Sequence, residues 1–230
     1  MEEGRTVAAA RDAAPSRDGE VERHWLVMLQ QLTSGVAHEL RNALNGVAVN
    51  LEVVRSRAGR DGLAASALGS FAGSASDQLE QVIAMTDALM VLARAGQDPA
   101  AIGRTTDQVA ALVRPALAAN GGALDLVVEG EGTTRVPTAA ARLFVAATVR
   151  AALDAARSTD GGDATKESGT ALTCRVREVA GEGGAKGVEL RVEGAFARTP
   201  ALEPALAKLA KEYGVGVRPT ESSITSTFPA

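Results

Sequence analysis

Residues 29–54 read LQQLTSGVAHELRNALNGVAVNLEVV, and their apolar side chains recur at steps of three and four residues. This repeat has the period of an α-helix with one apolar face. The sequence therefore predicts one long amphipathic helix over residues 21–57, which at ~1.5 Å per residue is about 50 Å long. Its apolar stripe comprises Leu29, Leu32, Val36, Leu40, Ala43, Val47, Leu51 and Val54.

A second helix is predicted over residues 64–95, after a short break at SRAGRDG (56–62). Two long helices joined by a short loop that contains glycine form an antiparallel hairpin. A hairpin of this length leaves much of both apolar stripes exposed when it stands alone, and pairing two copies into a four-helix bundle covers them. We therefore expect a homodimer. The second stripe comprises Leu68, Phe71, Ala75, Leu79, Val82, Thr86, Leu89 and Ala93.

The chain from residue 104 to residue 230 mixes helical and alternating stretches. Helices are expected at DQVAALVRPALAAN (107–120), AAARLFVAATVRAALDAAR (139–157) and ALEPALAKLAKEYG (201–214). Strands are expected at ALDLVVEG (123–130), TRVP (134–137), TALTCRVREV (170–179), GVELRVEG (187–194), VGVRP (215–219) and SSITSTFPA (222–230). The glycine-rich GEGGAKG (181–187) opens no helix, so we interpret it as a hairpin loop and not as a phosphate-binding loop.

The expected fold class is α+β, with two parts. A long antiparallel helical hairpin occupies residues 21–97, and a two-layer α/β sandwich follows over residues 104–230, with helices covering one face of a mixed sheet. Residues 1–20 mix charged residues, alanine, glycine and proline without periodicity, and we expect them to be a disordered tail.

The composition argues against several classes of partner and location. The net charge of −4 lacks the basic excess that is typical of nucleic-acid or anionic-membrane binding. The single cysteine, Cys174, forms no internal disulfide and fits a reducing cytosol. The first residues have no signal-peptide core, and no apolar run has the length of a membrane span. We therefore expect a cytoplasmic protein without a membrane segment.

His38 is one of two histidines in the chain and lies about 200° around the helix axis from Val36, so we expect it to point outward. Ser34, Arg41 and Asn42 share its face, and Glu39 is adjacent. A neutral imidazole is a nucleophile near pH 7, a carboxylate beside it raises its basicity, and an amide one turn away can orient a water molecule. On spacing alone, a surface histidine among ordinary polar residues is the favoured interpretation.

The stretch HELRNALNGVAVNLEVV (38–54) resembles the phosphoacceptor motif of bacterial sensor histidine kinases, H-E-[LI]-[RK]-[NT]-x-[LM]. That motif lies on the first helix of the family's dimerisation and histidine-phosphotransfer hairpin. The resemblance implies that His38 accepts a phosphoryl group, that Glu39 is its acid–base partner and that Asn42 positions water. Ala43 replaces the family's usual proline. The matching residues are His38, Glu39, Leu40, Arg41, Asn42 and Leu44.

The resemblance extends over the rest of the chain, but the nucleotide motifs are changed. RLFVAATVRAALDAA (142–156) resembles the helix whose two asparagines hold Mg²⁺ and the nucleotide phosphates, and here Ala147 and Ala151 take their places. Alanine offers no oxygen ligand to Mg²⁺. In the D-x-G-x-G motif that recognises adenine, Glu193 replaces the aspartate, and Ala195 replaces the first glycine, as Ala197 does the second. The G-x-G-[LM] motif is absent, and the chain after Glu193 is too short for an ATP lid.

The resemblance therefore implies a pseudokinase of two-component signal transduction that works as a histidine phosphotransferase. In this phosphorelay, phosphohistidine at His38 exchanges its phosphoryl group with aspartates of response-regulator receiver domains. The chain would need no intrinsic cofactor or metal, because the receiver brings its own Mg²⁺. Three alternatives remain open: an active sensor histidine kinase, a response-regulator phosphatase that uses Asn42, and a non-catalytic dimer that binds a regulator.

Overall fold

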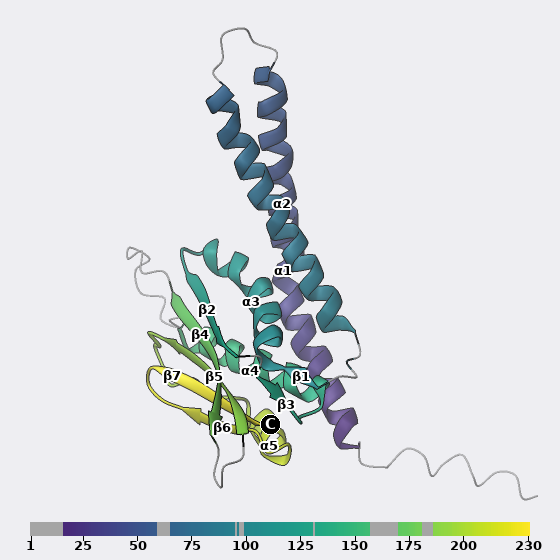
Figure 1. The fold of residues 1–230 in the computed structure, drawn as a ribbon, viewed down its shortest axis with the longest axis vertical. Helices are drawn as coiled ribbons and strands as arrows, with labels where there is room; N and C mark the ends of the chain where they lie inside the picture. The colour runs from purple at the N-terminus through teal and green to yellow at the C-terminus, as the bar shows by residue number, and fades with distance from the viewer. Residues whose placement is uncertain are drawn as a thin grey trace, which may run out of the picture.

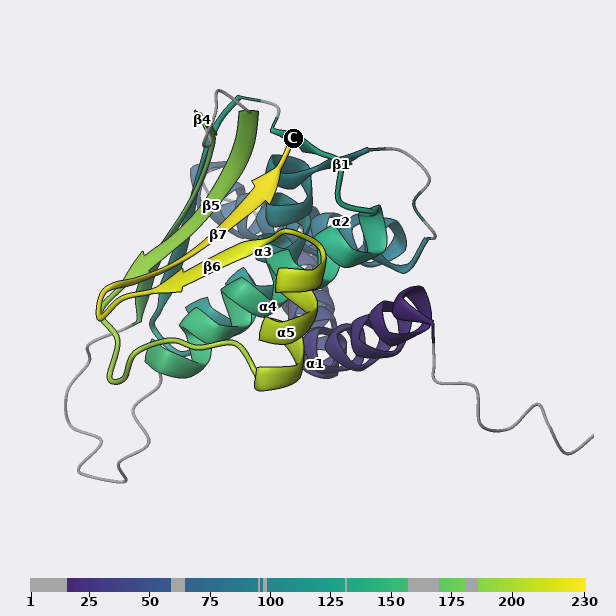
Figure 2. The same ribbon diagram turned by 90° about the horizontal axis from the view of Figure 1, so that it is seen from below.

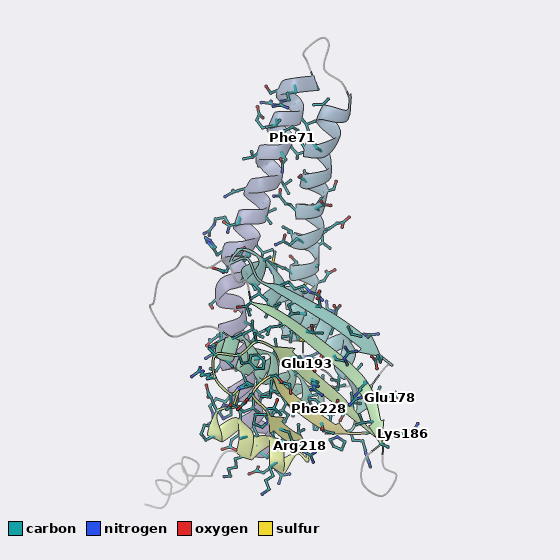
Figure 3. The ribbon with its side chains drawn as sticks, turned by 90° about the vertical axis from the view of Figure 1, so that its left-hand side faces the viewer. Phe71, Glu178, Lys186, Glu193, Arg218 and Phe228 are labelled. Carbon is teal, nitrogen blue, oxygen red and sulfur yellow. The ribbon has the colours of Figure 1, made fainter. Side chains whose placement is uncertain are left out.

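The computed structural model describes residues 16–58, 65–94, 96, 99–130, 132–156, 170–180 and 186–230. A long helical hairpin projects from an α/β domain (Figure 1). Helix α1 spans Arg17–Ala58 and helix α2 spans Ala65–Ala93, and the two run antiparallel along most of their length. Near the far end of the hairpin (Figure 3), the Arg57 guanidinium lies 4.8 Å from the centroid of the Phe71 ring.

The start of α1 corrects one expectation. Residues 17–20 were expected in the disordered tail, but they form the first turn of α1. Ser16 caps this turn, because its Oγ accepts a hydrogen bond from the Gly19 N–H at 3.3 Å, and acidic side chains in the first turn favour the positive end of the helix dipole. The same turn contacts the α/β domain, since Asp18 accepts a hydrogen bond of 3.1 Å from the Tyr213 hydroxyl.

The two helices of the hairpin approach closely at Gly46. A side chain at this position would meet the Gln78 amide of α2, so glycine leaves room for that amide. Gln78 Oε1 accepts a hydrogen bond of 3.2 Å from Asn50 Nδ2, one turn further along α1. This polar contact in the middle of the hairpin fixes which turn of α1 faces which turn of α2.

The sheet of the α/β domain has five strands in the order β2-β4-β5-β7-β6. Strands β2 (Ala123–Glu129) and β4 (Ala171–Ala180) are parallel, whereas β5 (Lys186–Gly194), β7 (Ser223–Pro229) and β6 (Gly216–Pro219) each run antiparallel to their neighbours. A separate pair joins β1 (Ala100–Ala101) to β3 (Thr133–Thr134). The antiparallel pairing of β4 with β5 agrees with the predicted hairpin at GEGGAKG, of which residues 181–185 lie outside the described residues.

Three helices, α3 (Ile102–Ala118), α4 (Thr138–Ala156) and α5 (Pro204–Glu212), cover one face of the sheet (Figure 2). The α+β fold class is thus confirmed. Buried side chains alternate along the strands toward these helices, among them Cys174, Leu190, Val192 and Phe228. Within this core, the hydroxyls of Thr148 on α4 and Ser226 on β7 lie 2.7 Å apart and satisfy each other.

The other face of the sheet is polar and carries ion pairs between neighbouring strands. Arg175 lies 3.0 Å from Glu129, and Arg177 lies 2.8 Å from Glu189. These pairs are exposed to solvent, so they contribute little to stability. The alternation of polar and apolar side chains, rather than the ion pairs, therefore decides which face packs on the helices.

The lower third of α1 packs on the α/β domain, where α1 contacts both α3 and α4. Val21, Trp25 and Met28 are buried there and join the same hydrophobic core as the residues of the sheet. The hairpin and the domain therefore share one core. None of the described helices combines the length and the apolar character that crossing a lipid bilayer requires.

Candidate functional site

His38 lies on the exposed side of α1, as the helical spacing predicted. Val36 and Ala43 are buried on the opposite side, against α2 and the domain. The turn is ordinary α-helix, so the backbone amides and carbonyls around His38 bond within the helix and the imidazole is free to meet a partner. Its chemical role remains a prediction.

The neighbours of His38 are distributed as the spacing predicted. Arg41 and Asn42 are exposed on the next turn, and Glu39 is half-buried at the flank of the helix. Among the residues that the structure describes, no hydrogen bond or ion pair involves any of these four side chains. The imidazole, the carboxylate and the amide are therefore all available to groups from outside the chain.

A cavity of about 300 Å³ opens beside the turn of α1 that precedes His38. Ser34 and Gly35 of α1 line it, together with apolar side chains of α3 and the end of α4. Ser34 is one turn before His38 on the same face of the helix. A partner protein that approaches His38 from this side would therefore contact both the His38 side chain and the cavity.

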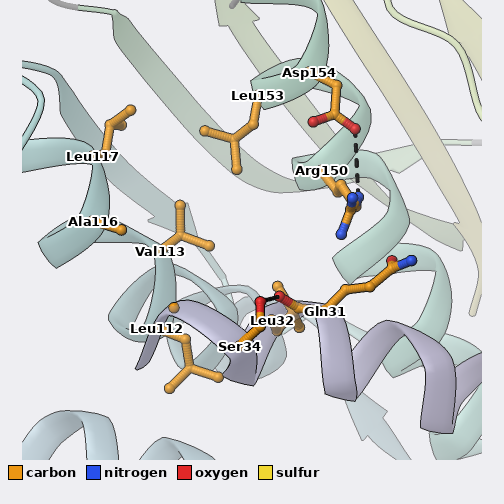
Figure 4. A pocket seen from close by; sticks show the side chains of 11 residues that line it. Gln31, Leu32, Ser34, Leu112, Val113, Ala116, Leu117, Arg150, Leu153 and Asp154 are labelled. Atoms are coloured by element: carbon orange, nitrogen blue, oxygen red, sulfur yellow. Dashed lines mark hydrogen bonds and ion pairs between the residues drawn. The ribbon is translucent and has the colours of Figure 1, made fainter. Parts of the chain in front are cut away.

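An ion pair on α4 forms the polar wall of this cavity. Arg150 Nε lies 3.4 Å from Asp154 Oδ2, and Figure 4 shows both side chains across the cavity from Gln31 and Ser34. Sequence reasoning noted Asp154 only as part of a family motif and missed Arg150. The spacing of four residues was the available signal, since it places opposite charges on one helix face, but it does not say that the face adjoins α1.

The alanines at the expected nucleotide positions lie where α4 meets α1 and α5. Ala147 and Ala151 are buried and line a cavity of about 40 Å³. Met28 of α1 and Leu206 of α5 line the same cavity. One water molecule takes up roughly 30 Å³ in the liquid, so this space is far below the size of a nucleotide site.

Of the other three expected nucleotide positions, Glu193 and Ala195 do not line the cavity of these alanines, whereas the Ala197 N–H donates to the Ala155 carbonyl of α4 at 2.8 Å. Val192 faces the helices, so its neighbour Glu193 points to the opposite face of the sheet, where it lies 2.9 Å from Arg191. Ala195 is exposed beyond the end of β5. The register of β5 thus separates the Glu193 carboxylate from the helix layer that contains Ala147 and Ala151.

The described residues include no group of three or more His, Cys, Asp or Glu side chains placed to hold a metal ion. Cys174 is buried in β4, and burial raises the pKa of its thiol to about 12. A thiol with that pKa is protonated at neutral pH and is neither a nucleophile nor a metal ligand. The candidate chemistry therefore rests on the polar face around His38.

Neither a protein-family model nor a curated protein sequence matches the chain. Solved structures that match include the blue-light activated histidine kinase of Erythrobacter litoralis EL346, which is 16% identical with a TM-score of 0.34. The match covers 86% of this chain, and the chain spans 59% of that protein's length.

Two further matches cover nearly the whole of the matched chain. The histidine kinase domain of the same Erythrobacter protein is 13% identical with a TM-score of 0.39, and the match covers 86% of this chain and 93% of that one. The histidine kinase AdeS of Acinetobacter baumannii is also 13% identical with a TM-score of 0.39, with coverages of 84% and 97%. Identities this low leave the activity to be argued from the residues of this chain.

Proposed function

We propose that the chain is a histidine phosphotransferase of two-component signalling, in which His38 carries a phosphoryl group between receiver domains. One observation supports it most: the polar face around His38 is exposed, whereas the expected nucleotide positions on α4 carry alanines that line, with Met28, a cavity of only about 40 Å³. The chain then presents a phosphoryl acceptor, while alanine offers no oxygen ligand for Mg²⁺ at those positions.

The transfer asks little of this chain beyond positioning. A neutral ring nitrogen of His38 attacks the phosphorus of a receiver aspartyl phosphate, the new P–N bond forms as the P–O bond breaks, and the aspartate leaves as a carboxylate. Glu39 accepts the hydrogen bond from the second ring nitrogen and stabilises the positive charge that develops on the imidazole. The receiver's Mg²⁺ neutralises charge on the phosphoryl oxygens. The reverse step delivers the group to a second receiver.

The exposed apolar side chains of the hairpin support assembly into a homodimer. Leu79, Ile83 and Met90 follow one another at helical spacing on α2, and all three are about half exposed. Leu44 and Leu51 are similarly exposed on α1 and one heptad apart. Burial of each such side chain against a second copy would contribute roughly 1–2 kcal/mol, so a four-helix bundle is the expected assembly.

The test is phosphoryl transfer to the purified chain from two donors. One is ATP labelled in its γ-phosphate, and the other is a set of receiver domains from the same genome, labelled by a small phosphodonor. We expect label from a receiver but not from ATP, and none in His38→Ala. Label from ATP would show an active kinase instead. No label from any receiver would leave a non-catalytic regulator-binding dimer as the better description.

Asn42 favours a second, related activity, because its exposed amide lies one turn from His38, where it can orient water. If the chain also dephosphorylates receivers, Asn42→Ala should slow the loss of receiver phosphate while leaving label transfer to His38 unchanged. Arg23→Gln, at an exposed position of α1 outside the motif, is the control. Equal phosphatase rates in the wild type and in Asn42→Ala would exclude this role.

A further inference from the structure

A second cavity, of about 410 Å³, lies at the end of α2, away from the face that bears His38. Its lining comes from both parts of the molecule: Val91 lies in the last turn of α2 and Arg94 directly follows that helix, whereas Arg104 on α3 and Arg142 on α4 belong to the α/β domain. Thr105 and Gln108 of α3 add polar groups. We call this cavity the three-arginine pocket.

The charges around the pocket are of one sign. Within the part of the chain that the structure describes, no acidic residue lines it, and none of the three guanidinium groups is ion-paired with a carboxylate. Asp98, the acidic residue nearest to the pocket in sequence, lies outside the described residues. Three like charges around one cavity repel one another, and an anion between them would remove that repulsion.

Arg142 is the most unusual of the three, because it is only 8% exposed. Its Nη1 donates a hydrogen bond to the backbone carbonyl of Arg94, which satisfies one donor but provides no counter-charge. Burial lowers the pKa of this guanidinium from its ordinary value. A buried charge without a partner is costly, so the site gains most from a ligand that brings negative charge.

Two helix N-termini adjoin the same space. The first turns of α3 and α4 contain no acidic side chain, and Ala101, the N-cap of α3, provides no capping group. The Ile102 N–H donates to the Gly132 carbonyl at 2.9 Å, but the next amides of the α3 first turn have no intrahelical acceptor. Both helix dipoles therefore add positive potential to that of the arginines.

We propose that the three-arginine pocket binds a small phosphate-bearing anion with at least two anionic groups, of the size of pyrophosphate or a nucleotide phosphate chain. Guanidinium groups form paired hydrogen bonds with phosphate oxygens, and the pocket volume lies within the range of small-molecule sites. Because Arg94 directly follows α2 and Arg104 and Arg142 belong to the domain, the ligand would join the end of the hairpin to the α/β domain.

The test is titration calorimetry of the full chain with pyrophosphate, with citrate and with Mg²⁺-free ATP, each against sodium chloride at matched ionic strength. Arg94→Gln and Arg104→Gln are the informative variants, because both side chains are exposed and the Arg94 carbonyl that holds Arg142 is retained. Arg218→Gln, on the exposed strand β6, is the matched control. We expect one pyrophosphate site per chain, about tenfold weaker in each pocket variant and unchanged in the control.

Several results would overturn the inference. No heat beyond the chloride control, or pyrophosphate binding as tight in both Arg94→Gln and Arg104→Gln as in the wild type, would show that the pocket does not take phosphate. Tighter binding of citrate than of pyrophosphate would exclude the phosphate class. ATP binding that is insensitive to both variants would place a nucleotide elsewhere and count against the proposed phosphotransferase instead. His38→Ala should bind pyrophosphate normally, so the two proposals fail separately.

Discussion

At the scale of single residues, two potential nucleophiles, His38 and Cys174, differ in their exposure to solvent. His38 stands on the exposed face of α1, whereas Cys174 is fully buried in the core between β4 and the helices. Burial disfavours the charged form of a thiol, so it acts in the direction that suppresses reactivity. Position in the fold, and not residue type, therefore decides which of them can react with an incoming partner.

Alkylation tests this directly. With the pKa of Cys174 raised to about 12, roughly one thiol in 10⁴ is ionised at pH 8, so iodoacetamide should leave the native chain unmodified for hours. Since the folded pKa is raised, the neutral thiol favours the fold below the unfolded pKa of 9.0, and this contribution is lost as pH rises toward 12. Guanidine-unfolded protein is the positive control. Rapid labelling of the native chain, followed by mass spectrometry, would contradict the burial argument.

At the scale of elements, the glycines of the hairpin differ in what surrounds them. A Cβ built on Gly73 of α2 meets nothing within 4 Å, whereas one on Gly46 of α1 meets the Gln78 side chain. Glycine in an exposed helix interior costs about 1 kcal/mol relative to alanine. Gly73 therefore weakens α2 although a larger side chain would fit there. At Gly46, by contrast, the Gln78 side chain leaves no room for a Cβ.

Gly73→Ala should raise the free energy of unfolding by about 0.5–1 kcal/mol, because it lowers the backbone entropy of the unfolded chain at no steric cost. Gly46→Ala gains the same propensity but must displace the Gln78 amide from Asn50, so we expect a smaller gain or a loss. Denaturant unfolding followed by circular dichroism measures both. Equal effects at the two positions would show that the Gln78 contact does not restrict Gly46.

The element scale also shows what the sequence could and could not predict. The stripe of α1 has the right phase at Val36 and Ala43, which are buried, but its member Leu51 is 53% exposed. The stripe of α2 was partly misplaced: Leu79 and Thr86 are exposed, whereas Met85, Ala88 and Leu92 are buried. Small and apolar residues surround α2 on several sides, so steps of three and four fit more than one phase.

Long-range pairing lay beyond local patterns as well. The strand pair β1–β3 is only two residues long on each side, and such pairs depend on contacts far along the chain. The start of α1 was visible in principle, since Ser16 before acidic residues is a capping signal. Around His38, the helical spacing predicted which side chains share a face, but it could not predict the cavity that α1 forms with α3 and α4. Nor could it predict that Glu193 points to the face of the sheet opposite the α4 alanines.

At the scale of the whole molecule, the apolar face of the hairpin is the feature that calls for a second copy. Ile83 is 52% exposed and lies one turn from Leu79, at 47%, on α2. Ile83→Glu should convert a dimer into a 23.5 kDa monomer without unfolding it, because it places a charge where we expect the bundle interface. Sedimentation velocity measures the mass.

Ala207→Glu is the matched control, since it adds the same charge to an exposed position of α5. If the wild type itself sediments as a monomer, or if Ile83→Glu remains a dimer, the interface lies elsewhere. Retention of the helical circular dichroism signal in Ile83→Glu would separate loss of assembly from loss of folding.

The continuity of α1 has one further consequence for how the molecule can be tuned. Met28, which lines the small cavity on α4, and His38 lie on the same uninterrupted helix, ten residues and about 15 Å apart along its axis. The number of helical residues between them therefore sets both the distance along the axis and the angle around it. Inserting one residue between them would turn the imidazole by about 100° relative to the sheet, and it would turn Gly46 and Asn50 away from Gln78 of α2 by the same angle. The direction in which the His38 side chain points is therefore set by its position along α1 and not by any contact of the side chain itself.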